Sequence, residues 1–126
     1  MKLREAGIEK PILVLGSMLP EVAEICVRYD ISHAVFDEER LYALNAAALK
    51  LHTKAKIHIK IDTGMHRIGV HVRDAGRFAK LAASLPGIYI EGVFSHFATA
   101  DADDKQYAAY QFERFQVQTD RQHTAY

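Results

Sequence analysis

Short apolar runs alternate along the chain with stretches in which apolar residues recur every three or four positions. Short runs predict strands, whereas a recurrence of three or four predicts helices. The first run, over 11–15, lies between Lys10 and Gly16 and is typical of a strand buried on both faces. The same pattern predicts three further strands, at 33–36, 57–62 and 88–95.

The helical spacing predicts helices at about 19–29 and 38–50, a third that ends before Pro86, and a last one after the fourth strand. Asp37 and Asp74 stand where aspartate can cap a helix N-terminus. The residues expected to face the core are Val22, Ile25, Cys26 and Tyr29 in the first helix, Leu41, Leu44, Ala48 and Leu49 in the second, Phe78, Leu81 and Leu85 in the third, and Tyr107, Tyr110, Phe112 and Phe115 in the last.

Strands that alternate with helices predict an α/β fold with a parallel sheet. The crossovers between parallel strands are right-handed, so the sheet would curve toward a barrel or form a doubly wound layer. A closed barrel of eight strand–helix units needs roughly 200 residues or more. The 126 residues supply about half of such a barrel, as one domain over 1–126 without a linker. Since two strand edges would stay open, we expect the chain to be part of a larger protein.

Composition changes this picture mainly by exclusion. Sixteen Lys and Arg balance sixteen Asp and Glu, so no basic field favours nucleic-acid binding. No apolar run is long enough to predict a membrane span. Cys26 is the only cysteine, which excludes an internal disulfide and a cysteine metal cluster. The expected setting is therefore the reducing cytoplasm.

Candidate chemistry begins at the third predicted strand, where isoleucine at 57, 59 and 61 alternates with His58, Lys60 and Asp62. Lys60 lies near the carboxyl end of this strand, and Arg67 follows a Thr-Gly-Met turn. Two cations so close need an anion between them, or one must lose its charge. Lys60 could form a Schiff base, or it could support Arg67 as Arg67 binds an anionic oxygen. From the pattern alone, an ion pair with Asp62 or another carboxylate is favoured.

His96 directly follows the fourth predicted strand and has several possible roles. A histidine at a strand end can act as a general base, ligate a metal, pack flat against a ring, or simply be satisfied by nearby backbone. The other histidines show no convincing metal spacing, and Gly64 and Gly69 form no phosphate-binding pattern. The aspartates at 101, 103 and 104 are interpreted as the cap and first turn of the last helix.

At these residues the chain resembles a known family. The segment 60–70, Lys-Ile-Asp-Thr-Gly-Met-His-Arg-Ile-Gly-Val, resembles the Lys-x-Asp-Thr-Gly-Met-x-Arg-x-Gly segment of alanine racemases. The segment 91–101, Glu-Gly-Val-Phe-Ser-His-Phe-Ala-Thr-Ala-Asp, followed by Gln111 and Phe115, is similar to the next strand and helix of that family. The opening residues 3–8 and 11–16 also fit, so the resemblance covers nearly the whole chain in unbroken order.

The resemblance implies a partial (β/α)8 TIM-type barrel of about four parallel units, strands three to six, followed elsewhere by a second β domain. It implies pyridoxal 5′-phosphate as cofactor and the interconversion of L- and D-alanine, which supplies D-alanine for peptidoglycan. It also implies a cytoplasmic homodimer. A barrel-type amino-acid decarboxylase and a non-catalytic pyridoxal-phosphate homeostasis protein are the alternatives, and the turn at 62–65 favours the racemase. An unrelated half-barrel module remains a further alternative.

Three residues inherit roles from this resemblance. Arg67 matches the arginine that donates to the phenolic oxygen of the cofactor near the substrate carboxylate. Lys60 matches a lysine that is carbamylated in some members, which would turn it into an anion and remove the charge conflict with Arg67. His96 matches the histidine that packs against the cofactor ring. Ser95 stands where many members have threonine, and His66 is given no role.

Other parts of the family's site have no counterpart in this sequence. The Schiff-base lysine of the family lies in a Lys-Ala-Asn-Ala-Tyr-Gly-like motif that is absent here. The resemblance places the phosphate-binding segments and the arginine that faces the pyridine nitrogen later in the barrel, and the catalytic tyrosine in the second domain. We therefore expect the isolated chain to be inactive as an enzyme.

Overall fold

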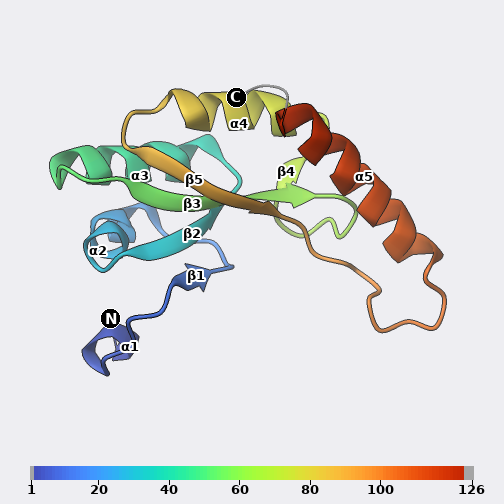
Figure 1. The fold of residues 1–126 in the computed structure, drawn as a ribbon, viewed down its shortest axis with the longest axis horizontal. Coiled ribbons are helices and arrows are strands. Elements are labelled where there is room, and N and C mark those ends of the chain that lie inside the picture. The colour runs from blue at the N-terminus through green and yellow to red at the C-terminus, as the bar shows by residue number, and fades with distance from the viewer. Residues whose placement is uncertain (1, 124–126) are drawn as a thin grey trace.

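The structure is a computed structural model that describes residues 2–123, with side chains described as far as Val117. Helices and strands alternate along the chain, as the sequence predicts (Figure 1). In order, the elements are α1 (Lys2–Glu5), β1 (Ile12–Val14), a 3-10 turn η1 (Pro20–Val22), α2 (Ala23–Arg28), β2 (Ile31–Val35), α3 (Glu38–Lys50), β3 (Ala55–Asp62), β4 (Val70–His71), α4 (Ala75–Ser84), β5 (Ile88–Phe94) and α5 (Gln106–His123).

The sheet has the sequential parallel order that a barrel requires. β1 pairs with β2, β2 with β3, and β3 with β5, all in parallel. This order confirms the four predicted strands, although β2 and β3 each begin two residues earlier than expected. The two-residue strand β4 was not predicted, since Val70–His71 is too short to show a period. It pairs in parallel with the last two residues of β3.

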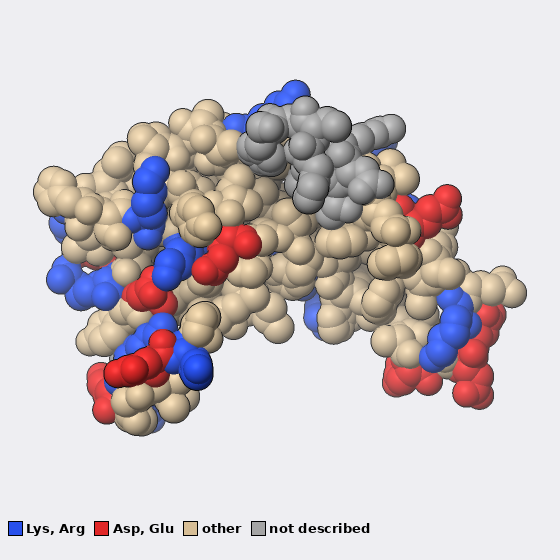
Figure 2. All heavy atoms as spheres, viewed as in Figure 1, with Lys and Arg blue, Asp and Glu red and all other residues tan. Residues whose placement is uncertain are grey.

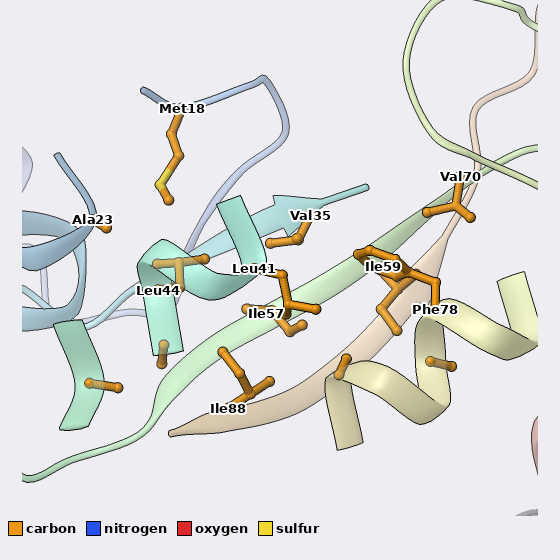
Figure 3. Packing of buried hydrophobic residues seen from close by; sticks show 14 of the residues in the cluster. Met18, Ala23, Val35, Leu41, Leu44, Ile57, Ile59, Val70, Phe78 and Ile88 are labelled. Carbon is orange, nitrogen blue, oxygen red and sulfur yellow. The ribbon is translucent and has the colours of Figure 1, made fainter. Parts of the chain in front are cut away.

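One face of the sheet forms the core, and α2, α3 and α4 lie along it (Figure 1). The isoleucines of β3 at 57, 59 and 61 are fully buried there. Burying a side chain of this size contributes about 1.5–3 kcal/mol relative to exposure. Figure 3 shows Ile57 and Ile59 near side chains of the covering helices, which include Leu41, Leu44 and Phe78.

The predicted helix ends and buried stripes are only partly confirmed. Asp37 caps α3 as expected, because its carboxylate accepts from the backbone N–H of Arg40 at 3.0 Å. Asp74 occupies the cap position of α4, but its side chain accepts no capping hydrogen bond, so that prediction is wrong. Ile25 and Leu49 are 41% and 48% exposed, because neither faces the sheet. Val27 and Ala47 are buried on these helices instead.

The aromatic stripe predicted for the last helix is also wrong as a core. Tyr107, Tyr110 and Phe112 are 38%, 48% and 51% exposed, and Phe115 is partly buried against the core. The physical reason is the place of α5, which lies beyond the carboxyl end of β5 and runs back toward α4, instead of lying along the sheet (Figure 1). The described residue that α5 buries completely is polar, namely Gln111.

The opposite face of the sheet carries a polar cluster that depends on a β-bulge. The register between β3 and β5 shifts after Ile57, so that Glu91 is the extra residue. Ser32 Oγ donates to Glu91 Oε2 at 2.6 Å, and His58 Nε2 lies 3.2 Å from the same oxygen. Gly92 leaves the space for this imidazole, because a Cβ there would lie 2.7 Å from His58 Nδ1. Three strands are thereby joined by side chains.

The outer surface is mixed in charge. Figure 2 shows Lys and Arg side by side with Asp and Glu on the face it presents, without one basic field. Ion pairs such as Arg77 with Glu38 and Lys50 with Glu24 lie on helices at the surface. None of the described helices is both long and apolar enough to cross a membrane.

Candidate active site

The candidate residues lie at the carboxyl ends of β3 and β5, above the polar cluster. Lys60 pairs with Phe94 in the sheet register, and its Nζ lies 5.5 Å from the centroid of the Phe94 ring. The same ring contacts His58 edge-on, with ring centroids 6.4 Å apart. The Phe94 ring therefore lies between the Glu91 cluster and Lys60. In parallel α/β folds, this end of the sheet is where active sites form.

Lys60 is a buried lysine without an ion pair in the described part of the chain. It is 5% exposed, and Asp62, the carboxylate whose charge acts on it, pairs with His66 instead. The ion pair that the pattern favoured, with Asp62 or another carboxylate, is therefore wrong. Burial lowers the pKa of Lys60, the charge of Arg67 lowers it further, and the charge of Asp62 offsets only part of this. The cation conflict noted in the sequence is thus present in the fold.

Asp62 is unavailable to Lys60 because its carboxylate holds the turn that follows β3. Its Oδ1 accepts the backbone N–H groups of Gly64 and His66, both at 3.0 Å. Burial alone would raise the pKa of Asp62, but these hydrogen bonds lower it overall. Gly69 closes the turn at a φ of 140°, and a Cβ there would lie 2.7 Å from the Asp62 backbone nitrogen. The turn is therefore restricted at both ends.

Arg67 lies in this turn with an exposed guanidinium. Among the described residues, no hydrogen bond or ion pair holds it. The turn follows the carboxyl end of β3, where Lys60 lies, and the positive charge of Arg67 helps to lower the pKa of Lys60. An exposed arginine beside a second cation is a suitable donor for an anionic oxygen of a ligand.

His96 follows β5 and is also exposed. Its backbone carbonyl accepts a hydrogen bond from Gln111, but within the described part of the chain its ring makes none. The reading in which backbone groups satisfy this ring therefore does not hold. A hollow of about 300 Å³ begins at this segment and runs between β5 and α5. Thr63 and His96 line it, whereas Lys60 and Arg67 do not.

A further polar group at this end of the sheet was not predicted from the sequence. Thr63 Oγ1 and Ser95 Oγ lie 2.7 Å apart, and Gln111 Nε2 donates to Thr63 Oγ1 at 3.2 Å. The hydroxyl of Tyr107 donates to the Gly64 carbonyl at 2.7 Å. The sequence contains one signal for this group, because Gln111 is a polar residue within an aromatic stripe of the last helix.

Comparison with known proteins decides the family. The family model described as the alanine racemase N-terminal domain matches residues 1–126. This chain belongs to the alanine racemase family. The alanine racemase of Halothermothrix orenii is 47% identical over 115 residues, which are 91% of this chain and 30% of that protein. The predicted resemblance to alanine racemases is thereby confirmed.

The fold match to alanine racemases is close. The structure of the alanine racemase of Clostridium difficile 630 superimposes with a TM-score of 0.94 at 35% identity, over 98% of this chain and 34% of that one. The predicted partial barrel is thereby confirmed. A histidine racemase of Leuconostoc mesenteroides matches with a TM-score of 0.84 at 27% identity, over 91% of this chain and 31% of that one. The chain therefore spans about a third of the length of the proteins it matches.

Proposed function

We propose that this chain forms the part of an alanine racemase that receives pyridoxal 5′-phosphate and the substrate, in a protein that interconverts L- and D-alanine. One observation carries the proposal. Arg67, an exposed arginine with no hydrogen bond or ion pair among the described residues, lies in the turn that follows β3, and the buried Lys60 near the end of that strand also has no ion pair among them. Such a pair of cations needs an anion, and the cofactor and an amino acid both supply anionic oxygens.

The residues present fit this cofactor. Arg67 would donate hydrogen bonds to its phenolic oxygen, and the ring of His96 would pack against its ring. When bound, the cofactor supplies an electron-withdrawing ring system that stabilises the charge left as the α-proton departs. Arg67 would also orient the substrate carboxylate nearby, since guanidinium binds carboxylate in a fixed geometry.

Lys60 is proposed to support Arg67 as a carbamate. Its neutral amine would attack carbon dioxide to give an N-carboxylate anion, and one proton would be released. Burial and the nearby Arg67 favour the neutral amine, because both lower the pKa of Lys60. The new anion would then pair with Arg67. Nuclear magnetic resonance with carbon-13-labelled bicarbonate tests this, since Lys60→Arg must abolish any carbamate signal that the unmodified protein shows.

The rest of the proposal follows the family. The Schiff-base lysine, the phosphate-binding segments and the catalytic tyrosine are expected outside this chain, in a homodimeric cytoplasmic enzyme that supplies D-alanine for peptidoglycan. The isolated chain is expected to show no racemase activity. One buried charged hydrogen bond contributes about 1.5–3 kcal/mol, whereas micromolar affinity needs roughly 8 kcal/mol. Micromolar cofactor binding by the isolated chain would contradict this expectation.

The proposal is tested in a chimera in which this chain replaces the matching segment of the Halothermothrix orenii alanine racemase. The unaltered chimera is expected to form D-alanine from L-alanine. Arg67→Ala is expected to lower kcat/KM by about 10²–10³, as the loss of a charged donor in an active site does. Arg77→Ala, an exposed arginine on α4, is the matched control. A chimera that folds and binds the cofactor without racemising alanine would contradict the proposal.

The substrate class has one alternative with a specific observation behind it. A histidine racemase matches this fold over 91% of the chain, so the fold of this segment also occurs in a protein named for a different amino acid. An assay of the chimera with a panel of L-amino acids distinguishes the two. Preference for histidine over alanine would move the assignment to an amino-acid racemase of different specificity.

A further inference from the structure

The described part of α5 contains one fully buried side chain, and it is an amide. Gln111 is 0% exposed, while its neighbours Tyr110 and Phe112 are about half exposed. A buried amide without hydrogen-bond partners costs roughly 1–3 kcal/mol on the scale of protein mutations. A glutamine in this place therefore needs specific partners. It does not lie on the face of Lys60, and the proposed chemistry makes no use of it.

The Gln111 amide has a partner for each of its polar groups. Its Nε2 donates to Thr63 Oγ1 at 3.2 Å and to the His96 carbonyl at 3.1 Å. Its Oε1 accepts the backbone N–H of Ala98 at 2.9 Å. Rotating the amide by half a turn would place its NH2 group against the backbone N–H of Ala98, and its oxygen against the carbonyl oxygen of His96. Both contacts would be repulsive. The partners therefore fix one orientation of the side chain.

A second residue of α5, Tyr107, lies one helical turn before Gln111 and also bonds to the loop that follows β3. The Tyr107 hydroxyl donates to the Gly64 carbonyl at 2.7 Å. Gly64 permits this approach, because a Cβ there would lie 2.6 Å from that hydroxyl. Residues 107 and 111 thus present their polar ends to the two segments that follow β3 and β5. We refer to the hydrogen bonds of Tyr107 and Gln111, together with the Thr63–Ser95 contact, as the α5 network.

We propose that Gln111 is a positioning residue that fixes the Arg67 turn relative to His96. The inference rests on the proposed function, since those two residues are the ones assigned to the cofactor. Gln111 bonds to Thr63, which begins the turn, and directly to the backbone of His96. Among the described residues it hydrogen-bonds to neither the Arg67 guanidinium nor the His96 imidazole, so it acts through the backbone that carries them. Without the amide, the direct hydrogen bond described between the two segments is the one that joins Thr63 and Ser95.

The test uses the chimera described above, with turnover expressed per bound cofactor. Gln111→Met keeps the length of the side chain and removes all three hydrogen bonds. It is expected to lower kcat about tenfold, to leave KM within about twofold, and to change the visible circular dichroism of the bound cofactor. Gln111→Glu keeps the acceptor for the backbone N–H of Ala98. Its kcat is expected to lie between that of the unaltered chimera and that of Gln111→Met. Gln106→Met, at an exposed glutamine on the same helix, is the matched control and is expected to leave both readouts unchanged.

A purely structural role would give a different result. In that case Gln111→Met would lower the melting temperature and the fraction of protein that binds the cofactor. The kcat per bound cofactor and the visible circular dichroism would stay unchanged. This result would overturn the inference.

If Gln111→Met does not fold, Tyr107→Phe replaces it, because this substitution removes a single hydrogen bond of the α5 network. We expect Tyr107→Phe to lower kcat about threefold. An unchanged kcat would show that the α5 network does not position the cofactor residues. If the unaltered chimera binds the cofactor but racemises no amino acid, the proposed function fails instead.

Discussion

The two faces of β3 differ in the kind of contact they make, although they belong to one strand. On the helix side, the isoleucines at 57, 59 and 61 are fully buried among many apolar neighbours. On the other side, His58 meets one oxygen of Glu91, and Lys60 meets one aromatic ring. Apolar packing needs only volume and proximity, whereas polar contacts need a particular partner. The first face supplies the buried apolar packing of the strand, and the second carries polar groups that each depend on one partner.

The largest change in stability is expected from a substitution that creates a cavity on the helix side of β3. Ile59→Ala is expected to lower the free energy of unfolding by about 2–5 kcal/mol, because the rigid core closes only partly around the lost methyl groups. Urea denaturation of the chimera measures it. Ile25→Ala, at an isoleucine that is 41% exposed on α2, is the control and should cost less than half as much. Equal costs at the two sites would contradict the division of the faces.

The next largest change in stability is expected when a methyl group is added at Gly92, on the polar side of the sheet. Gly92→Ala would place its Cβ 2.7 Å from His58 Nδ1, so the imidazole must leave Glu91. The expected cost is about 1–3 kcal/mol in the free energy of unfolding. In a His58→Ala background the same substitution should cost little. Gly76→Ala meets open space within helix α4 and should instead stabilise by about 0.5–1 kcal/mol. A large cost of Gly92→Ala without His58 would show that the backbone, and not the ring, is the obstacle.

The helix side also holds a buried histidine, which predicts a dependence of stability on pH. His33 is buried on β2, where its Nε2 lies 3.0 Å from Cys26 Sγ and its Nδ1 has no partner within the described structure. Burial lowers the pKa of His33. As the pH falls below about 6.5, the unfolded chain takes up a proton that the folded chain refuses, so stability falls. The loss should be smaller than that of Ile59→Ala.

Denaturation of the chimera at a series of pH values between about 8 and 5 measures this dependence. His33→Leu should reduce the slope. The control is His52→Asn, at an exposed histidine whose φ of 53° suits asparagine, and it should leave the slope unchanged. An identical slope in His33→Leu would assign the dependence to other groups.

The smallest effect on stability is expected at Lys60. Lys60→Met removes a buried ammonium that has no ion pair among the described residues, so stability at neutral pH should stay within about 1 kcal/mol or rise. Any gain should shrink as the pH rises toward about 10.5, where the lysine becomes neutral in the unfolded chain as well. Denaturation in buffer freed of carbon dioxide measures this. A loss of about 3–5 kcal/mol would instead indicate a partner that holds the charge.

The same contrast explains how much the sequence could predict. Alternation at 57–62 predicted both the buried isoleucines and the polar face, since the period of a strand is local. The ion pair favoured for Lys60 failed for a local reason, because the Asp62 carboxylate is used by the turn two and four residues later. An aspartate two residues before a glycine is a signature of such turns. Asp62 and Gly64 carry this signature, so the sequence does contain a signal for the turn contact.

The parts that could not be predicted depend on contacts between distant residues. Gln111 and Thr63 are 48 positions apart, and no periodicity links a helix residue to a turn on another element. The exposure of the α5 aromatics has the same origin, since it depends on where α5 lies relative to β5. Periodicity gives the face of a helix that is apolar, but it does not give what covers that face.

The short strand β4 has a consequence for the cost of binding. Residues 63–69 leave the end of β3 and return to it, because Val70 and His71 pair with Ile61 and Asp62 of the same strand. The loop that carries Arg67 is therefore closed on its own starting point. Its conformational entropy is lost when the chain folds, before any ligand arrives. An anion that binds Arg67 need not order this loop, so more of the interaction energy is retained as affinity.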